Sequence, residues 1–204
     1  PLYEQALHER QRVLGSDHPD TLITRHNLAG AYQAAGDLKQ AIPLYEQTLH
    51  ERQRVLDNDH PHTLITRHNL ASAYETAGNL KRAIPLYEQT LHDQERVLGS
   101  DHPHTLITRN SLAHAHQAAG DLGRAIPLYE QALHDQERVL GSDHPHTLIT
   151  RNSLAYAHRA AGDLGRAIPL YEQALHDQER VLGSDHPHTL ITRNSLAYAH
   201  RAAG

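Results

Sequence analysis

Apolar side chains recur along the chain at spacings of three and four residues, which is the spacing of one face of an α-helix. Two such stripes alternate, one over residues 19–34 and one over residues 38–56. Gly36 and Asp37 stand between them and fit the end of one helix and the N-cap of the next. The pattern therefore predicts an all-α chain of antiparallel helix pairs joined by short turns.

The ends of these helices carry their own signals. Asp17 is predicted to be the N-cap of the first helix, because its carboxylate can accept orphan amide bonds and Pro19 suits a first turn. Pro43 falls inside the second stripe, where we expect a continuous helix with a mild bend; the alternative is a helix that starts at Pro43. Gly15 fits a left-handed C-terminal cap, and where Asp57-Asn58 replaces Gly-Ser we expect the Asn to take that conformation.

The same text returns every 42 residues. Residues 127–162 and 169–204 are identical, and the phrase PLYEQ(A/T)LH opens at Pro1, Pro43, Pro85, Pro127 and Pro169. Such a period predicts one array over residues 1–204, with repeats 1–42, 43–84, 85–126, 127–168 and an incomplete 169–204. Each helix pair buries its apolar face against its neighbours.

Composition narrows the class of protein. The 204 residues include no Phe, Trp, Met or Cys, so the core must consist of Leu, Ile, Val, Ala and Tyr, and disulfides and thiolate sites are excluded. The net charge of −5 is spread over interleaved signs, so we expect no nucleic-acid partner. No apolar run approaches the ~20 residues of a membrane span, and no signal peptide is recognisable. We expect a cytoplasmic protein and, since no Met opens the chain, a fragment, a processed product or an engineered array.

The stretch from Asn27 to Leu49 resembles the tetratricopeptide repeat (TPR) family. The positions that carry the resemblance are Leu28, Ala29, Tyr32, Gly36, Leu38, Ala41, Tyr45 and Thr48. The eight residues beyond the usual 34, within ERQRVLxxDHPxT, are similar to the 42-residue repeats of kinesin light chains. The resemblance implies a right-handed superhelical solenoid without catalytic activity or cofactor, whose inner groove, lined by the first helix of each pair, holds a peptide or protein segment. Where the family has a large aromatic residue early in that helix, this chain has Arg25 and its counterparts.

Three positions of the first helix vary between repeats and share one face, because they are four and three residues apart. Asn can hold a peptide backbone, Tyr offers apolar area with a polar tip, and Arg binds carboxylates. We therefore predict a peptide-binding surface that is best developed in the last two repeats. Its predicted residues are His68, Asn110, His114, Gln117, Asn152, Tyr156, Arg159, Asn194, Tyr198 and Arg201. The alternative is neutral drift on a solvated face.

Other candidate chemistry is weaker. His60-Pro61-His62 and its copies place two imidazoles near a helix start, whereas zinc needs three or four ligands, so we expect capping rather than a metal site. His116, His158 and His200 stand where Tyr32 stands in the first repeat, and we expect them partly buried. Carboxylates such as Glu46 and Glu51 are interpreted as solvated. No phosphate loop, GxSxG or HExxH motif is present, which argues against an enzyme.

A second function class follows from the ends of the array. The chain starts within a second-type helix and finishes after a first-type helix, so each end is predicted to leave apolar surface uncovered. Near-identical repeats could then stack head to tail between molecules into an open superhelix. The alternative to a peptide-binding scaffold is therefore a self-assembling structural array, and the two differ in whether mass grows with concentration.

Overall fold

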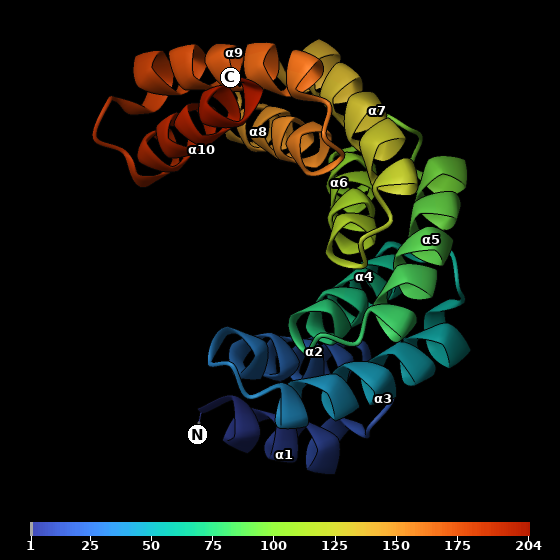
Figure 1. The fold of residues 1–204 in the computed structure, drawn as a ribbon. Helices are drawn as coiled ribbons and strands as arrows, with labels where there is room; N and C mark the ends of the chain where they lie inside the picture. Colours follow the sequence, from blue (N-terminus) through green and yellow to red (C-terminus); the bar gives the residue numbers. More distant parts are fainter. Residues whose placement is uncertain (1) are drawn as a thin grey trace. The chain divides into compact units, whose positions relative to one another are not determined.

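The computed structural model describes residues 2–204, which form ten α-helices and no strand (Figure 1). The helices are α1 (Leu2–Leu14), α2 (Pro19–Ala34), α3 (Leu38–Leu56), α4 (Pro61–Thr76), α5 (Leu80–Val97), α6 (Pro103–Ala118), α7 (Leu122–Leu140), α8 (Pro145–Ala160), α9 (Leu164–Leu182) and α10 (Pro187–Ala203). We call the even-numbered helices the A helices and the odd-numbered helices the B helices. The predicted all-α repeat solenoid is confirmed.

The chain divides into two compact units, an N-terminal unit of residues 1–108 and a C-terminal unit of residues 109–204. Within each unit, consecutive helices pack on one another, from α1 to α5 in the first and from α7 to α10 in the second. Neighbouring A helices also touch, α2 on α4 and α8 on α10. The A helices therefore form one layer of each unit and the B helices another.

Small and aromatic side chains fill the space between the layers. Tyr45 on α3 and Tyr87 on α5 are almost fully buried in the N-terminal unit, as are Tyr129 and Tyr171 in the C-terminal unit. In the C-terminal unit Tyr171 packs in a cluster with alanines of α8, α9 and α10. Buried alanines let the helices approach closely, while each tyrosine supplies the large apolar area that a core without Phe or Trp would otherwise lack.

The predicted Asp17 cap is wrong. His18 is the N-cap of α2, and its Nδ1 accepts a hydrogen bond from the amide of Asp20 at 3.2 Å. His60, His144 and His186 cap α4, α8 and α10 in the same way. Because Pro19 occupies the first helical position, the cap must be the residue directly before it, and the Asp lies one residue too early. Asp17 pairs instead with Arg54 of α3.

The other helix ends match expectation more closely. Asp37 caps α3, with its Oδ1 accepting from the amide of Gln40 at 3.3 Å. Pro43 lies inside α3, so the continuous helix is confirmed and a start at Pro43 is wrong. Where a B helix ends, Gly15 and its copies have φ near +90°, and Asp57, not Asn58, takes this position in the second loop.

Candidate functional site

The first variable position of the A helices, residues 26, 68, 110, 152 and 194, lies at the contact with the next repeat in all but the last helix. His26 Nδ1 lies 3.3 Å from Thr66 Oγ1, and His68 Nδ1 lies 3.0 Å from Thr108 Oγ1. In the C-terminal unit, Asn110 and Asn152 accept hydrogen bonds from the threonines forty residues further on, at 2.9 Å and 3.0 Å. These side chains are half-buried, so they link repeats as well as bordering the surface. Asn194, on the last helix, is exposed.

The two histidines of this row sit in surroundings that disfavour charge. Burial lowers the pKa of His26 to about 4, and the nearby Arg52 guanidinium and His62 add to the effect. Burial also lowers the pKa of His68 to about 4, with a further contribution from His104. Each imidazole packs edge-on against the ring of a buried tyrosine, His26 on Tyr45 and His68 on Tyr87, with centroids 5.3 Å apart. Both are therefore neutral at pH 7.

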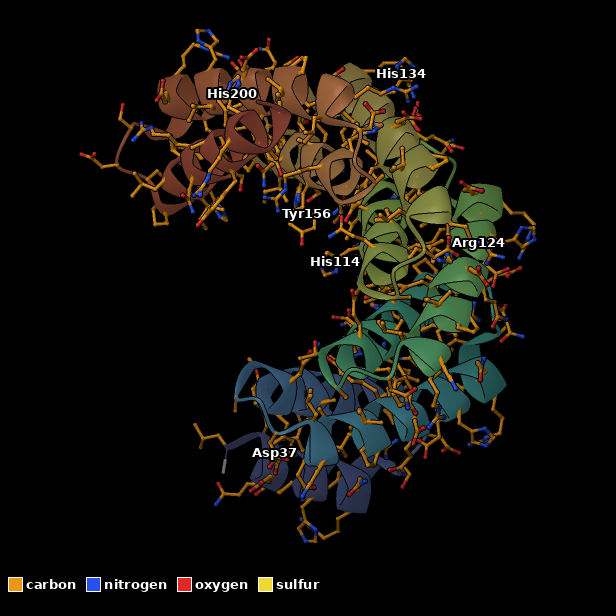
Figure 2. The ribbon with its side chains drawn as sticks, viewed as in Figure 1. Asp37, His114, Arg124, His134, Tyr156 and His200 are labelled. Atoms are coloured by element: carbon orange, nitrogen blue, oxygen red, sulfur yellow. The ribbon has the colours of Figure 1, made fainter. Side chains whose placement is uncertain are left out.

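The second variable position carries the exposed aromatic groups. Tyr156 is 42% exposed and Tyr198 is 56% exposed. His114 and Tyr156 project from the same side of the C-terminal unit (Figure 2). In the N-terminal unit the same position is small, since Gly30 faces the Tyr45 hydroxyl and Ser72 accepts a hydrogen bond from Gln33 at 3.2 Å. Only the C-terminal unit therefore presents large side chains at this position.

The third variable position, residues 33, 75, 117, 159 and 201, is neutral, acidic, neutral, basic and basic in turn. Glu75 on α4 accepts a hydrogen bond from the Tyr87 hydroxyl at 2.8 Å. Arg159 on α8 has its guanidinium 4.9 Å from the centre of the Tyr156 ring, a cation–π contact that holds both groups at the surface. Gln117 and Arg201 continue the row on α6 and α10, half-buried and exposed respectively. The C-terminal unit thus brings Asn, Tyr and Arg onto one face.

Buried ion pairs that were not predicted from the sequence join α2, α4, α6 and α8 to the B helix that follows each of them. Arg25, Arg67, Arg109 and Arg151 are almost fully buried. Arg25 Nη1 lies 2.5 Å from Glu51 Oε2, so the interpretation of Glu51 as solvated is wrong. The same pair joins Arg67 to Asp93 at 2.6 Å and Arg109 to Asp135 at 2.7 Å. The available signal was an Arg in each of α2, α4, α6 and α8 that is followed 26 residues later by Glu or Asp.

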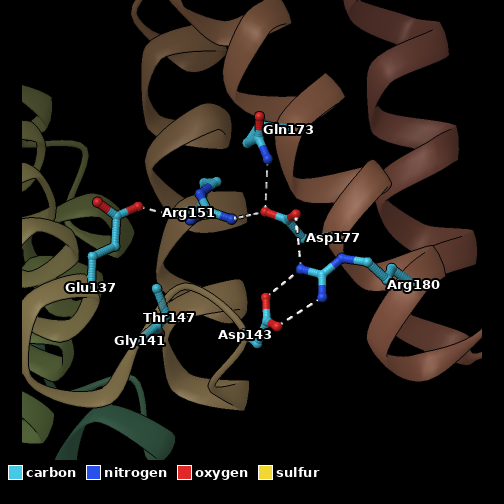
Figure 3. Close-up of polar contacts among 8 residues, drawn as sticks. All are labelled: Glu137, Gly141, Asp143, Thr147, Arg151, Gln173, Asp177 and Arg180. Atoms are coloured by element: carbon cyan, nitrogen blue, oxygen red, sulfur yellow. Dashed lines mark hydrogen bonds and ion pairs between the residues drawn. The ribbon is translucent and has the colours of Figure 1, made fainter.

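Figure 3 shows the fullest version of this arrangement, around Arg151. Its Nη1 donates to Asp177 Oδ2 at 2.5 Å and its Nη2 donates to Glu137 at 2.7 Å. Gln173 also donates to Asp177, at 2.9 Å, and Arg180 joins Asp177 to the loop residue Asp143. The network fixes α8 against α9 and the preceding loop. Because these side chains bond to one another, we interpret the network as structural and not as a binding site.

The remaining histidines fall into two sets. His144 and His146 stack at 5.3 Å, and the pairs at 60/62, 102/104 and 186/188 stack in the same way. The first His of each pair accepts a hydrogen bond from the backbone amide of the second. No group of three or more potential metal ligands is found among residues 2–204. His116 and His158 are buried as expected, each within 3.7 Å of a carboxylate. His200 contradicts that expectation, because its side chain on α10 is 55% exposed.

None of the described helices is both long enough and apolar enough to pass through a membrane.

The comparisons with known proteins agree with this geometry. Residues 1–50, 93–135 and 113–176 match a family model described as tetratricopeptide repeat, and residues 63–104 match a second model of that description. A solved protein from Podosopora anserina, described as a kinesin light chain with nearly identical TPR-like repeats, is 37% identical to this chain. The alignment covers 92% of this chain and 89% of that one, with a TM-score of 0.81.

Two further comparisons complete this result. BtubC (BKLC) from P. vanneervenii has a TM-score of 0.84 at 23% identity, over 99% of this chain and 82% of that one, which shows a shared fold. No curated protein matches the chain.

Proposed function

Because this chain belongs to the tetratricopeptide repeat family, we propose that it is a non-catalytic scaffold that binds a protein or peptide segment along its A helices. We place the strongest binding on the C-terminal unit, at the variable face formed by its three variable positions. The residues of that face are Asn110, His114, Gln117, Asn152, Tyr156, Arg159, Asn194, Tyr198 and Arg201. His68 belongs to the same rows in the N-terminal unit.

One observation supports this proposal above the others. Tyr156 stands exposed beside Arg159, which lies over its ring. Tyr and Arg are the residues most enriched among those that dominate binding energy at protein interfaces. Tyr156 and Tyr198 stand at the same position of successive A helices and expose apolar surface to water without adding to the core. This favours a binding role over neutral drift.

A selection from a displayed peptide library, followed by fluorescence anisotropy, tests the proposal. We expect selected peptides to bind the double variant Tyr156→Ala/Arg159→Ala at least tenfold more weakly than the wild type. The control is His134→Ala/His176→Ala on α7 and α9; both histidines are exposed, and His134 projects away from Tyr156 (Figure 2). Equal binding by wild type and double variant, or an equal loss in the control, would refute the proposal.

A second candidate function is self-assembly, with a second copy of the chain as the occupant of the α10 surface. Leu190 on α10 is 46% exposed, whereas its counterpart Leu148 on α8 is 1% exposed. Residues 187–202 repeat residues 145–160 letter for letter, and α1 differs from residues 170–182 only at Glu9, Arg10 and Gln11. The contact between α8 and α9 is therefore a template for α10 of one copy against α1 of another.

Sedimentation velocity over a concentration series separates the two functions. Self-assembly predicts a mass that rises with concentration and returns to one chain in Leu190→Asp, because a charge at the centre of the contact is costly to bury. The control Val139→Asp changes an exposed side chain on α7 and should keep the wild-type behaviour. A constant single-chain mass would exclude assembly and leave the peptide-binding scaffold.

A further inference from the structure

A pocket of about 200 Å³ lies in the N-terminal unit between α4, α5 and the start of α6. Its volume is well above the ~10–15 Å³ that one water molecule requires. The residues that line it are Ile65, His68, Asn69, Gln94, His104, Ile107 and Thr108. It borders the A-helix surface through His68, one of the residues of the proposed binding rows.

An acceptor without a donor lines this pocket. Gln94 is only 1% exposed, and its Oε1 accepts no hydrogen bond within the described part of the chain. Leaving a buried amide oxygen unsatisfied is unfavourable, because the group has lost its hydrogen bonds to water. The pocket is therefore matched to a group that donates hydrogen bonds.

The chain itself shows which donor fits, one repeat earlier. The counterpart of Gln94 is Arg52, whose Nη1 donates to the carbonyl of His62 at 2.8 Å and to Thr66 Oγ1 at 2.5 Å. The counterparts of these two acceptors are His104 and Thr108, and both line the pocket. Arg52 is buried and donates to a carbonyl and a hydroxyl rather than to a carboxylate. Burial lowers its pKa to about 10, so it stays protonated at neutral pH.

A carboxylate close to His68, one of the residues that line the pocket, also favours a cation. Glu75 interacts electrostatically with His68 and accepts a hydrogen bond from Tyr87, whose ring meets the His68 imidazole. His68 itself is neutral at pH 7. In the fourth repeat this charge is reversed, because Arg159 stands at the repeat position of Glu75.

We propose that this pocket binds the guanidinium group of an arginine side chain carried by the segment that the scaffold recognises. The guanidinium donates to Gln94 Oε1 and to the acceptors of His104 and Thr108, while the Glu75 carboxylate supplies the opposite charge. The proposal rests on the proposed function for the origin of the arginine. It adds a sequence requirement to the ligand.

Titration of the full chain with ethylguanidinium, followed by NMR, tests the pocket directly. We expect saturable shifts of the Gln94 side-chain amide and of the Thr108 backbone amide, at concentrations far below those that denature proteins. Ethylammonium, with fewer donors and no planar fork, should bind at least tenfold more weakly. Glu75→Gln, which adopts the residue found at positions 33 and 117, should weaken ethylguanidinium binding several-fold.

Two matched substitutions complete the test. Gln94→Arg places a guanidinium in the pocket from within, as Arg52 does one repeat earlier, and should lower the affinity at least tenfold. Gln178→Arg makes the same change at the counterpart position on α9, outside this pocket, and should leave binding at the pocket unchanged. Absence of saturable shifts in the wild type, or wild-type affinity in a folded Gln94→Arg, would overturn the proposal.

This experiment is independent of the peptide selection. Selected peptides that need no arginine, together with a pocket that ignores ethylguanidinium, would remove this inference and leave the scaffold function. A pocket that binds ethylguanidinium in a chain that binds no peptide would instead remove the scaffold function.

Discussion

Two kinds of buried side chain affect the stability of this protein, the arginines paired with carboxylates and the neutral histidines. Arg151 on α8 is almost fully buried and is held there by Asp177 and Glu137. A buried ion pair contributes little net stability when both partners are present, but removing one partner leaves an uncompensated charge. The packing of α2, α4, α6 and α8 therefore depends on the carboxylate that the following B helix supplies to the buried arginine.

Replacing Arg151 with Met should destabilise the chain by about 3 kcal/mol, because Asp177 remains buried with only Gln173 and Arg180 beside it. Urea unfolding followed by circular dichroism measures the change. The control is Arg193→Met on α10, where the counterpart arginine is exposed and pairs with an exposed Glu179, so the change should be within about 0.5 kcal/mol. Equal losses in the two variants would show that the buried pair has no special role.

His68 is expected to make stability depend on pH. Its folded pKa of about 4 lies below the unfolded value of ~6.5, so the unfolded chain binds the proton more tightly. The stability contribution is complete above pH 6.5 and is lost as the pH falls from 6.5 through 4, with a total of at most about 3 kcal/mol. Unfolding free energies measured from pH 7.5 to 4 should therefore fall less steeply in His68→Asn than in the wild type.

The substitution is one that the chain already uses. Asn110 occupies the position of His68 in the next repeat and accepts the equivalent threonine hydrogen bond. His134→Asn, at an exposed site on α7, is the control and should keep the wild-type slope. If His68→Asn and the wild type lose stability in parallel on acidification, the buried imidazole is not the cause.

At the scale of the helix, the loop after each B helix depends on a backbone conformation that suits glycine. Gly141 has φ 90° and ψ 160°, a region that other residues occupy at a cost of about 1–3 kcal/mol. Asp57 adopts φ 76° and ψ 177° at the same position and offsets part of that cost, because its carboxylate accepts hydrogen bonds from the amides of Asp59 and His60. An alanine has no such compensation.

Gly141→Ala should therefore lower the free energy of unfolding by about 1–3 kcal/mol. Gly123, the second residue of α7, is the matched control, because a Cβ there would meet only the Asp121 carboxylate at 3.7 Å, an ordinary contact. Gly123→Ala should raise stability by roughly 1 kcal/mol through helix propensity. Thermal melts of the two variants should move in opposite directions, and movement in the same direction would contradict the backbone argument.

The bounds of some helices could be predicted from the sequence, because each apolar stripe recurs 42 residues later. For example, α2 spans residues 19–34 as expected. The N-cap residue of α2 could not be predicted in this way, because Asp17 and His18 both carry a hydrogen-bond acceptor. His18 is the cap because Pro19, which follows it directly, is the first helical residue. The partners of Arg25 and its copies could not be derived either, since a charged residue on an apolar stripe reads equally well as a break in the stripe. The binding rows were found by comparing repeats, but their threonine contacts depend on how one repeat packs on the next.

At the scale of the whole chain, stability should follow the number of repeats, because packing joins each helix mainly to its neighbours in sequence. The near-identity of the last repeats allows a clean test of this additivity. Deleting residues 127–168 joins residue 126 to residue 169, and every local sequence around the junction is one that the intact chain already contains. The shortened chain should therefore keep its helix content per residue.

The shortened chain should also unfold at a lower urea midpoint, because one repeat and one interface between repeats have been removed. Far-ultraviolet circular dichroism reports the helix content, and urea melts report the midpoint and the slope, which should fall with the surface buried. A midpoint equal to that of the full chain would mean that stability is set locally within a repeat. Loss of the helical signal would mean that residues 127–168 hold a contact that their near-identical copies cannot supply.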